Sequence, residues 1–164
     1  MTILAVIIQL AISLVRSITK LSLTCLSLLR SRIDLHSTIR FPLTIRGKGV
    51  FKLGSEIKLF NGLVILNDGF FELGKKSEIH QRVKIRISSL SGLTIGKNVI
   101  LEELTSIAVR KNNWILNDNV YVAGGCSIFS RENKFEGNLI VGSNSNISNN
   151  CTFDVTGDLT IGQN

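Results

Sequence analysis

The chain has 164 residues, a mass of 18.0 kDa and a formal net charge of +7. Hydrophobic residues make up 44% and charged residues 19%, which excludes a disordered chain, while 6% aromatics and one proline exclude an aromatic platform for single-stranded nucleic acid and a proline-rich rod. Three cysteines without a CxxC pair, together with only two histidines, exclude a disulfide framework and a metal centre built from cysteines or several histidines.

Residues 1–32 predict an amphipathic α-helix that forms a unit of its own. The segment carries four basic residues and no acid. Its excess of base therefore sits beside the most apolar stretch, which favours a membrane surface over a nucleic-acid partner. We expect peripheral membrane association through this helix. Its polar residues recur at steps of three or four, which places them on one narrow stripe: Gln9, Ser13, Arg16, Lys20, Thr24, Ser27 and Ser31.

Three other interpretations of this segment stay open. The helix could pack on the body of the protein. It could span a bilayer, at a cost of ~2.5–3.5 kcal/mol each for Arg16 and Lys20 in mid-membrane. It could be a signal peptide, although it lacks a basic n-region and a small-residue cleavage site.

Residues 33–164 contain an internal repeat in which aliphatic residues return at six-residue steps. Dipeptides of an aliphatic residue followed by Gly or Asn recur at intervals of 20 to 25 residues, and each except Ile161-Gly162 is followed by two further hexads. The period differs from the 3.6 residues of an α-helix and the two residues of an alternating strand. All nineteen positions are large and apolar: Ile33, Ile39, Ile45, Leu53, Leu59, Ile65, Leu73, Ile79, Ile85, Ile95, Leu101, Ile107, Leu116, Val122, Ile128, Val141, Ile147, Phe153 and Ile161.

This repeat predicts an all-β solenoid of about six rungs over residues 33–164, preceded by the N-terminal amphipathic α-helix. Each hexad places one aliphatic side chain inward and then turns a corner, so that three short flat strands close one rung. The rungs stack through parallel hydrogen bonds at ~4.8 Å. The inward side chains then form one continuous core, to which each buried Ile or Leu contributes ~1.5–3 kcal/mol.

The residues between the inward positions predict how the corners form. The position after the first aliphatic residue of a rung is Gly54, Gly74, Gly96, Asn117, Gly142 or Gly162. Gly and Asn tolerate the left-handed backbone region, so we expect a tight corner there. The fourth position is an asparagine in four successive rungs, which predicts a side-chain ladder through Asn98, Asn119, Asn144 and Asn164.

Several of these units resemble the hexapeptide-repeat signature: an aliphatic residue, glycine, two variable residues and a small or β-branched residue. The units are Ile95-Gly96-Lys97-Asn98-Val99, Val141-Gly142-Ser143-Asn144 and Ile161-Gly162-Gln163-Asn164. The signature belongs to the left-handed parallel β-helix acyltransferases, and residues 147–164 are similar to the polysaccharide O-acetyltransferases among them. The left hand of the coil is implied by this resemblance alone, since crossovers between parallel strands are otherwise right-handed.

The resemblance implies an enzyme, an acyl-CoA-dependent O-acetyltransferase that modifies a sugar hydroxyl in cell-surface polysaccharide biosynthesis. In that family one histidine takes the proton of the sugar hydroxyl, which attacks the thioester of acetyl-CoA. The resemblance also implies acetyl-CoA as acyl donor, a sugar or glycan acceptor, a homotrimer and no metal. It further implies a cytoplasmic location, at the inner face of the cell membrane.

In the resembled enzymes the catalytic histidine follows a unit like residues 161–164. The chain ends at Asn164. We therefore expect the coil to be incomplete at its C-terminus and the catalytic segment to lie beyond this residue. On this interpretation the chain contains no catalytic residue, and the 164 residues alone have no transferase activity.

The histidines and cysteines of the chain do not match that role. His80 follows the inward Ile79 and His36 lies near the helix junction, so both are expected to be exposed to solvent. Cys126 and Cys151 take the fifth position of their hexads, where small residues fill the core. We predict that they pack rather than react, and we assign no residue to acetyl-CoA binding.

The third side of the fifth rung is longer than the others, and its segment 130–137 must bulge out of the coil. In the resembled enzymes such excursions shape the acceptor site. Arg131, Asn133 and Lys134 are therefore candidate substrate-binding residues. An ordinary solvated loop is the alternative.

A second class of function stays open. The chain could be a non-catalytic β-helical scaffold that residues 1–32 tether to a membrane. A carbonic-anhydrase-like β-helix is excluded, because it needs three zinc-binding histidines and the chain has two.

Overall fold

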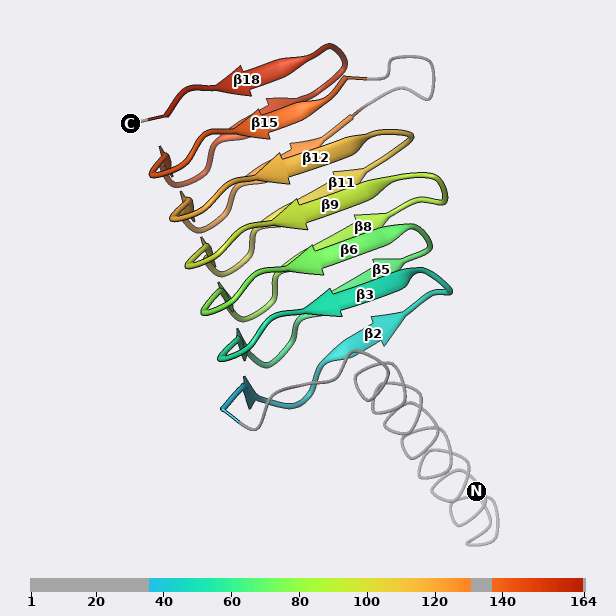
Figure 1. Cartoon of the computed structure of the whole chain (residues 1–164), viewed down its shortest axis with the longest axis vertical. Helices are drawn as coiled ribbons and strands as arrows, with labels where there is room; N and C mark the ends of the chain where they lie inside the picture. The colour runs from blue at the N-terminus through green and yellow to red at the C-terminus, as the bar shows by residue number, and fades with distance from the viewer. Residues whose placement is uncertain (1–35, 131–136, 164) are drawn as a thin grey trace, which may run out of the picture.

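Three parallel β-sheets of six short strands each wrap around one core in the computed structural model (Figure 1). The structure describes residues 36–130 and 137–163. Within them the chain passes through the three sheets in turn and returns to the first sheet one coil higher. This part of the chain is an all-β parallel β-solenoid of about six turns without a helix, which confirms the solenoid that the hexads predict.

Each sheet contains every third strand of the chain. Sheet A consists of β1 (Thr38–Ile39), β4 (Lys58–Leu59), β7 (Glu78–Ile79), β10 (Ile100–Leu101), β13 (Tyr121–Val122) and β16 (Asn146–Ile147). Sheet B consists of β2 (Thr44–Arg46), β5 (Val64–Asn67), β8 (Lys84–Ile87), β11 (Ser106–Val109), β14 (Ser127–Phe129) and β17 (Thr152–Asp154). Sheet C consists of β3 (Val50–Leu53), β6 (Phe70–Leu73), β9 (Gly92–Ile95), β12 (Asn113–Leu116), β15 (Leu139–Val141) and β18 (Leu159–Ile161).

The hexad residues pair with one another across the coils, which confirms the predicted register. Sheet A pairs Ile39, Leu59, Ile79, Leu101, Val122 and Ile147. Sheet B pairs Ile45, Ile65, Ile85, Ile107, Ile128 and Phe153. Sheet C pairs Leu53, Leu73, Ile95, Leu116, Val141 and Ile161. Fourteen of these eighteen side chains are buried, and the partly exposed ones lie toward the ends of the stack: Ile39, Leu53, Phe153 and Ile161.

The fifth position of a hexad is a second inward position. Aliphatic residues there, such as Leu63 and Val83, are fully buried. Where a hydroxyl residue takes this place, the next coil supplies its partners. Ser77 Oγ donates to the carbonyl oxygen of Gly96 at 2.8 Å and accepts from the amide of Val99 at 3.0 Å. These bonds offset the cost of burying the hydroxyl.

The corner glycines serve a different purpose from the predicted one. Positive φ does not occur at these glycines but two residues later, at Glu56, Lys76, Asn98, Asn119 and Asn144, with values between 54° and 61°. A Cβ on Gly74 would overlap the carbonyl oxygen of Gly96, and one on Gly142 would lie 2.7 Å from the amide nitrogen of Gln163. The close approach of the next coil therefore requires glycine at these positions.

The predicted asparagine ladder runs along the same corner. Asn98 Nδ2 donates to Asn119 Oδ1 at 3.1 Å, and Asn119 Nδ2 donates to Asn144 Oδ1 at 3.0 Å. All three residues have positive φ, which asparagine tolerates better than most residues. One residue type thus turns the chain and joins the coils. Asn164, the fourth member of the prediction, lies outside the described residues.

Other predictions also fall outside this part of the chain. The helix over residues 1–32 is not among the described residues, and neither is Ile33. Across residues 36–130 and 137–163, no helix is long and apolar enough to cross a membrane. The left hand of the coil stays a prediction.

We expect Gly74→Ala to destabilise the solenoid by ~1–3 kcal/mol, because two backbones in contact cannot make room for a methyl group by rotating a side chain. Gly162→Ala is the matched control, since a Cβ at that position meets no described atom within 4 Å. Thermal unfolding followed by circular dichroism measures both changes. Equal transition temperatures for the two variants would contradict the close-approach explanation.

Candidate functional site

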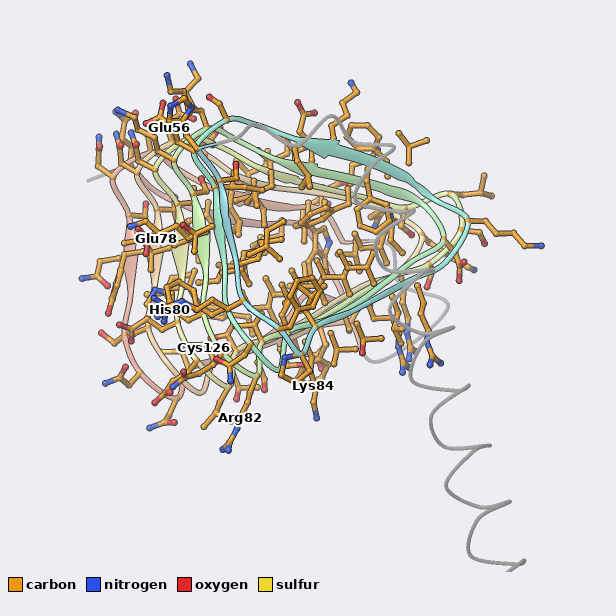
Figure 2. All side chains as sticks on the ribbon, turned by 90° about the horizontal axis from the view of Figure 1, so that it is seen from below. Glu56, Glu78, His80, Arg82, Lys84 and Cys126 are labelled. Carbon is orange, nitrogen blue, oxygen red and sulfur yellow. The ribbon has the colours of Figure 1, made fainter. Side chains whose placement is uncertain are left out.

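His80 lies on the outer face of sheet A, beside a carboxylate. β7 places Ile79 in the core. Its neighbours Glu78 and His80 both point outward, because alternate residues of a strand face opposite sides. Figure 2 shows the two side chains on the same outer face of the coil. The short sequence Glu-Ile-His therefore brings an acid and an imidazole together.

These two side chains belong to a group of five that spans three coils. Lys58 Nζ lies 2.6 Å from Glu78 Oε1, and Glu78 Oε2 lies 3.4 Å from His80 Nε2. The rings of His80 and Phe60 pack with their centroids 4.7 Å apart, and the guanidinium of Arg40 lies 4.9 Å from the Phe60 centroid. We call Arg40, Lys58, Phe60, Glu78 and His80 the sheet A cluster.

Glu78 is the negative centre of the sheet A cluster. The hydrogen bond from Lys58 is the main cause that holds the pKa of Glu78 below its ordinary value of 4.5. Partial burial opposes this effect, while the charge of Lys58 and the contact with His80 add to it. Glu78 is therefore ionised at neutral pH, with one oxygen toward the lysine and the other toward the imidazole.

The sheet A cluster fixes the position of His80 more firmly than the sequence predicts. The expected solvent-exposed side chain is instead half-buried, with 33% of its surface exposed. A carboxylate beside an imidazole can hold the ring in place and select its tautomer, which favours general-base catalysis. However, Nε2 faces Glu78 and makes no aligned hydrogen bond, and Phe60 covers the ring. The arrangement can orient an imidazole, but His80 lines neither the groove at the corner between sheets C and A nor the groove on sheet B.

Glu78 is the contact that the sequence analysis missed. The available signal is the alternation Glu-Ile-His around a core residue, together with Lys58 twenty residues earlier. Strand alternation alone places Glu78 and His80 on one face. The contribution of Lys58 requires the register between β4 and β7, in which Lys58 pairs directly with Glu78.

A shallow groove of about 390 Å³ borders the sheet A cluster at the corner between sheets C and A. Its charges are mutually compensated. Glu56 lies 3.0 Å from Lys75 and 3.8 Å from Lys76, and the hydrogen bond from Lys75 lowers the pKa of Glu56. This pairing is ordinary surface chemistry. The groove is lined by His36, Glu56, Lys58, Lys76 and Glu78, of which His36 is exposed as predicted.

The two described cysteines pack inside the coil, as predicted. Both thiols are free. Cys126 is fully buried, and its Sγ lies 3.1 Å from the carbonyl oxygen of Ser148. Burial raises the pKa of the Cys126 thiol, which disfavours the reactive thiolate. Cys151 lies one coil higher and is half-buried.

The candidate substrate-binding residues Arg131, Asn133 and Lys134 lie outside the described residues. In the part of the chain that the structure describes, no three His, Cys, Asp or Glu side chains come together as a metal site would require. No protein-family model matches the chain, and no curated protein matches its sequence.

We expect Glu78→Gln to lower the free energy of unfolding at neutral pH by less than ~1 kcal/mol, as for a partly exposed ion pair. The folded-state pKa of Glu78 lies below its unfolded value of 4.5. Its contribution is therefore present above that pH and is lost as the pH falls through the folded-state pKa. Urea titrations at a series of pH values should show wild type and variant converging in acid.

The control for this prediction is Glu72→Gln on the outer face of sheet C. Among the described residues, Glu72 forms no ion pair. The same chemical change there should alter the unfolding free energy little. If the free energies of unfolding of wild type and Glu78→Gln differ by the same amount at every pH, the stabilising effect does not come from the charge of Glu78.

Proposed function

We propose that the chain is the β-solenoid of an acyl-CoA-dependent O-acetyltransferase that acts on a sugar hydroxyl in cell-surface polysaccharide biosynthesis. The observation that carries this proposal is the hexad register, in which equivalent aliphatic residues pair through all three sheets. Hexads with this spacing are the signature that the chain shares with the hexapeptide-repeat acyltransferases. On the same ground we propose that the coil is left-handed.

The proposed reaction needs few protein groups. A sugar hydroxyl attacks the thioester carbonyl of acetyl-CoA, and a general base takes the hydroxyl proton. The C–S bond then breaks, the acetyl group stays on the sugar oxygen, and the CoA thiolate takes up a proton. Holding donor and acceptor side by side supplies much of the acceleration. We assign the base to no described residue, because Nε2 of His80 faces Glu78 and Phe60 packs against the imidazole ring.

The proposed enzyme is a homotrimer at the cytoplasmic side of the membrane. Apolar side chains on the outer face of sheet C support contacts between copies of the chain. Val50 is 56% exposed and Ile140 is 41% exposed, and each points away from the core of its own coil. Residues 1–32 are the proposed membrane contact, and acetyl-CoA and a glycan are the proposed substrates.

Isothermal titration of the full chain with acetyl-CoA tests this function. We expect saturable binding that free CoA displaces, because donor and product share most of their contacts. Absence of binding would contradict the proposal and favour the membrane-tethered scaffold. His80→Ala should leave acetyl-CoA binding unchanged, with His36→Ala as its control. If the chain cleaves the thioester in the presence of a sugar acceptor, and only His80→Ala loses this activity, His80 is the base.

Co-sedimentation with anionic lipid vesicles tests the membrane contact. A basic residue near an anionic membrane contributes ~1 kcal/mol of attraction. The double variant Arg16→Gln/Lys20→Gln should therefore bind about tenfold or more weakly, and high salt should weaken wild-type binding as well. Lys52→Gln on sheet C is the control and should bind as the wild type does. Binding of the double variant to the vesicles at wild-type strength would show that residues 1–32 are not the anchor.

A further inference from the structure

The outer face of sheet B carries a groove across three adjacent strands, β5, β8 and β11. It has a volume of about 390 Å³, which is within the size range of small-ligand sites. The groove is open to solvent on the face opposite the core. Its outward side chains come in pairs from β5, β8 and β11: Val64 and Leu66, Lys84 and Arg86, and Ser106 and Ala108.

The register gives this groove a defined layout. Val64, Lys84 and Ser106 form one row across the strands, and Leu66, Arg86 and Ala108 form the other. Residues two apart on a strand are separated by about 6.6 Å, so the two cationic side chains start from neighbouring points on the same face. Ser106 and Ala108 on β11 have small side chains, which leave open space beside Lys84 and Arg86.

The cations in this groove have no counter-charge among the described residues. Lys84 and Arg86 are exposed, and neither forms an ion pair within the part of the chain that the structure describes. The outward neighbours on β5 and β11 are uncharged. Lys58, Lys75 and Lys76 on other surfaces each lie within 4 Å of a carboxylate. Lys52 on sheet C forms no ion pair among the described residues either, but its Nζ lies over the ring of Phe70.

Nearby cations extend the same sign of charge. Arg46 on β2 lies in the row of Arg86, two strands below it. Arg82 is at the corner just before β8, and Figure 2 shows Arg82 and Lys84 projecting away from the coil. Like charges at this spacing repel one another. An anion bound between them would remove that repulsion and gain charge-assisted hydrogen bonds.

We propose that this groove binds an anionic saccharide. The sugar rings lie against Val64, Leu66 and Ala108, and the carboxylate or phosphate groups of the saccharide pair with Lys84 and Arg86. The Ser106 hydroxyl is placed to hydrogen-bond a sugar hydroxyl. This inference rests on the proposed function and names its acceptor class, an acidic glycan.

The shape of the face favours a saccharide over a bilayer. Interfacial binding to a membrane buries large apolar side chains in the lipid. Among the described residues, the exposed large hydrophobic side chains are Phe41, Val50, Leu90, Leu104 and Ile140, and none of these lies on a strand of sheet B. Lys84 and Arg86 lie on the middle strand of a recess of small-ligand size, and this face has no large exposed apolar side chain that could enter lipid.

Calorimetric titration of the full chain with an oligosaccharide of uronic acids tests the inference, and a neutral glucose oligosaccharide of equal length is the comparison. We expect the acidic oligosaccharide to bind and the neutral one to bind at least about tenfold more weakly. Lys84→Gln/Arg86→Gln should lose about tenfold or more in affinity, because the neutral side chains cannot form charge-assisted hydrogen bonds to the acid groups of the saccharide. Lys52→Gln on sheet C should bind like the wild type. Circular dichroism verifies that the variants are folded.

Four outcomes would overturn the inference: no binding of the acidic oligosaccharide, equal binding of the neutral one, wild-type affinity in the double variant, or displacement of the oligosaccharide by CoA. Displacement by CoA would assign the groove to the acyl donor. If the wild type binds no saccharide and Lys84→Gln/Arg86→Gln no longer co-sediments with lipid vesicles, the outer face of sheet B is a membrane contact instead. Acetyl-CoA binding that persists when saccharide binding fails would leave the proposed function intact. Saccharide binding without acetyl-CoA binding would support the groove as a saccharide site and contradict the proposed acetyltransferase.

Discussion

Adjacent coils meet at the ~4.8 Å spacing of parallel strands, and the other features of the structure depend on this contact. At the corner between sheets C and A, two backbones come so close that Gly74 and Gly142 cannot carry a Cβ. Two residues later the chain turns through the left-handed region, where Asn119 also bonds the coils above and below. Each coil thus restricts the residues that the next coil can carry.

The same stacking determines the chemistry of the outer faces. On sheet A the pairing of β4 with β7 places Lys58 beside Glu78, so opposite charges compensate each other. On sheet B the pairing of β5, β8 and β11 surrounds Lys84 and Arg86 with uncharged residues. The backbone scaffold is alike on both faces. A function specific to one face must therefore come from its side chains and not from the fold.

Much of the fold could be predicted because its information is local and repeated. Six-residue steps between aliphatic residues predict the inward columns, and the pairing of Ile85 with Ile107 follows once the coil length is known. Burial of Cys126 follows from its fifth position in a hexad. The candidate sites were less predictable. Glu78 is a neighbour of His80 by strand alternation alone, but the contact with Phe60 requires the register between coils.

The sequence by itself determined the solenoid, the inward side of every strand and the asparagine corner, because each of these repeats within one coil and is visible as a period. Only the tertiary structure decided why the corner glycines are needed, how far His80 is buried and which cations lack a counter-charge. These properties depend on residues 20 to 25 positions apart that become neighbours through stacking. Coil lengths vary from one turn to the next, so charged residues at similar intervals are not always opposite one another.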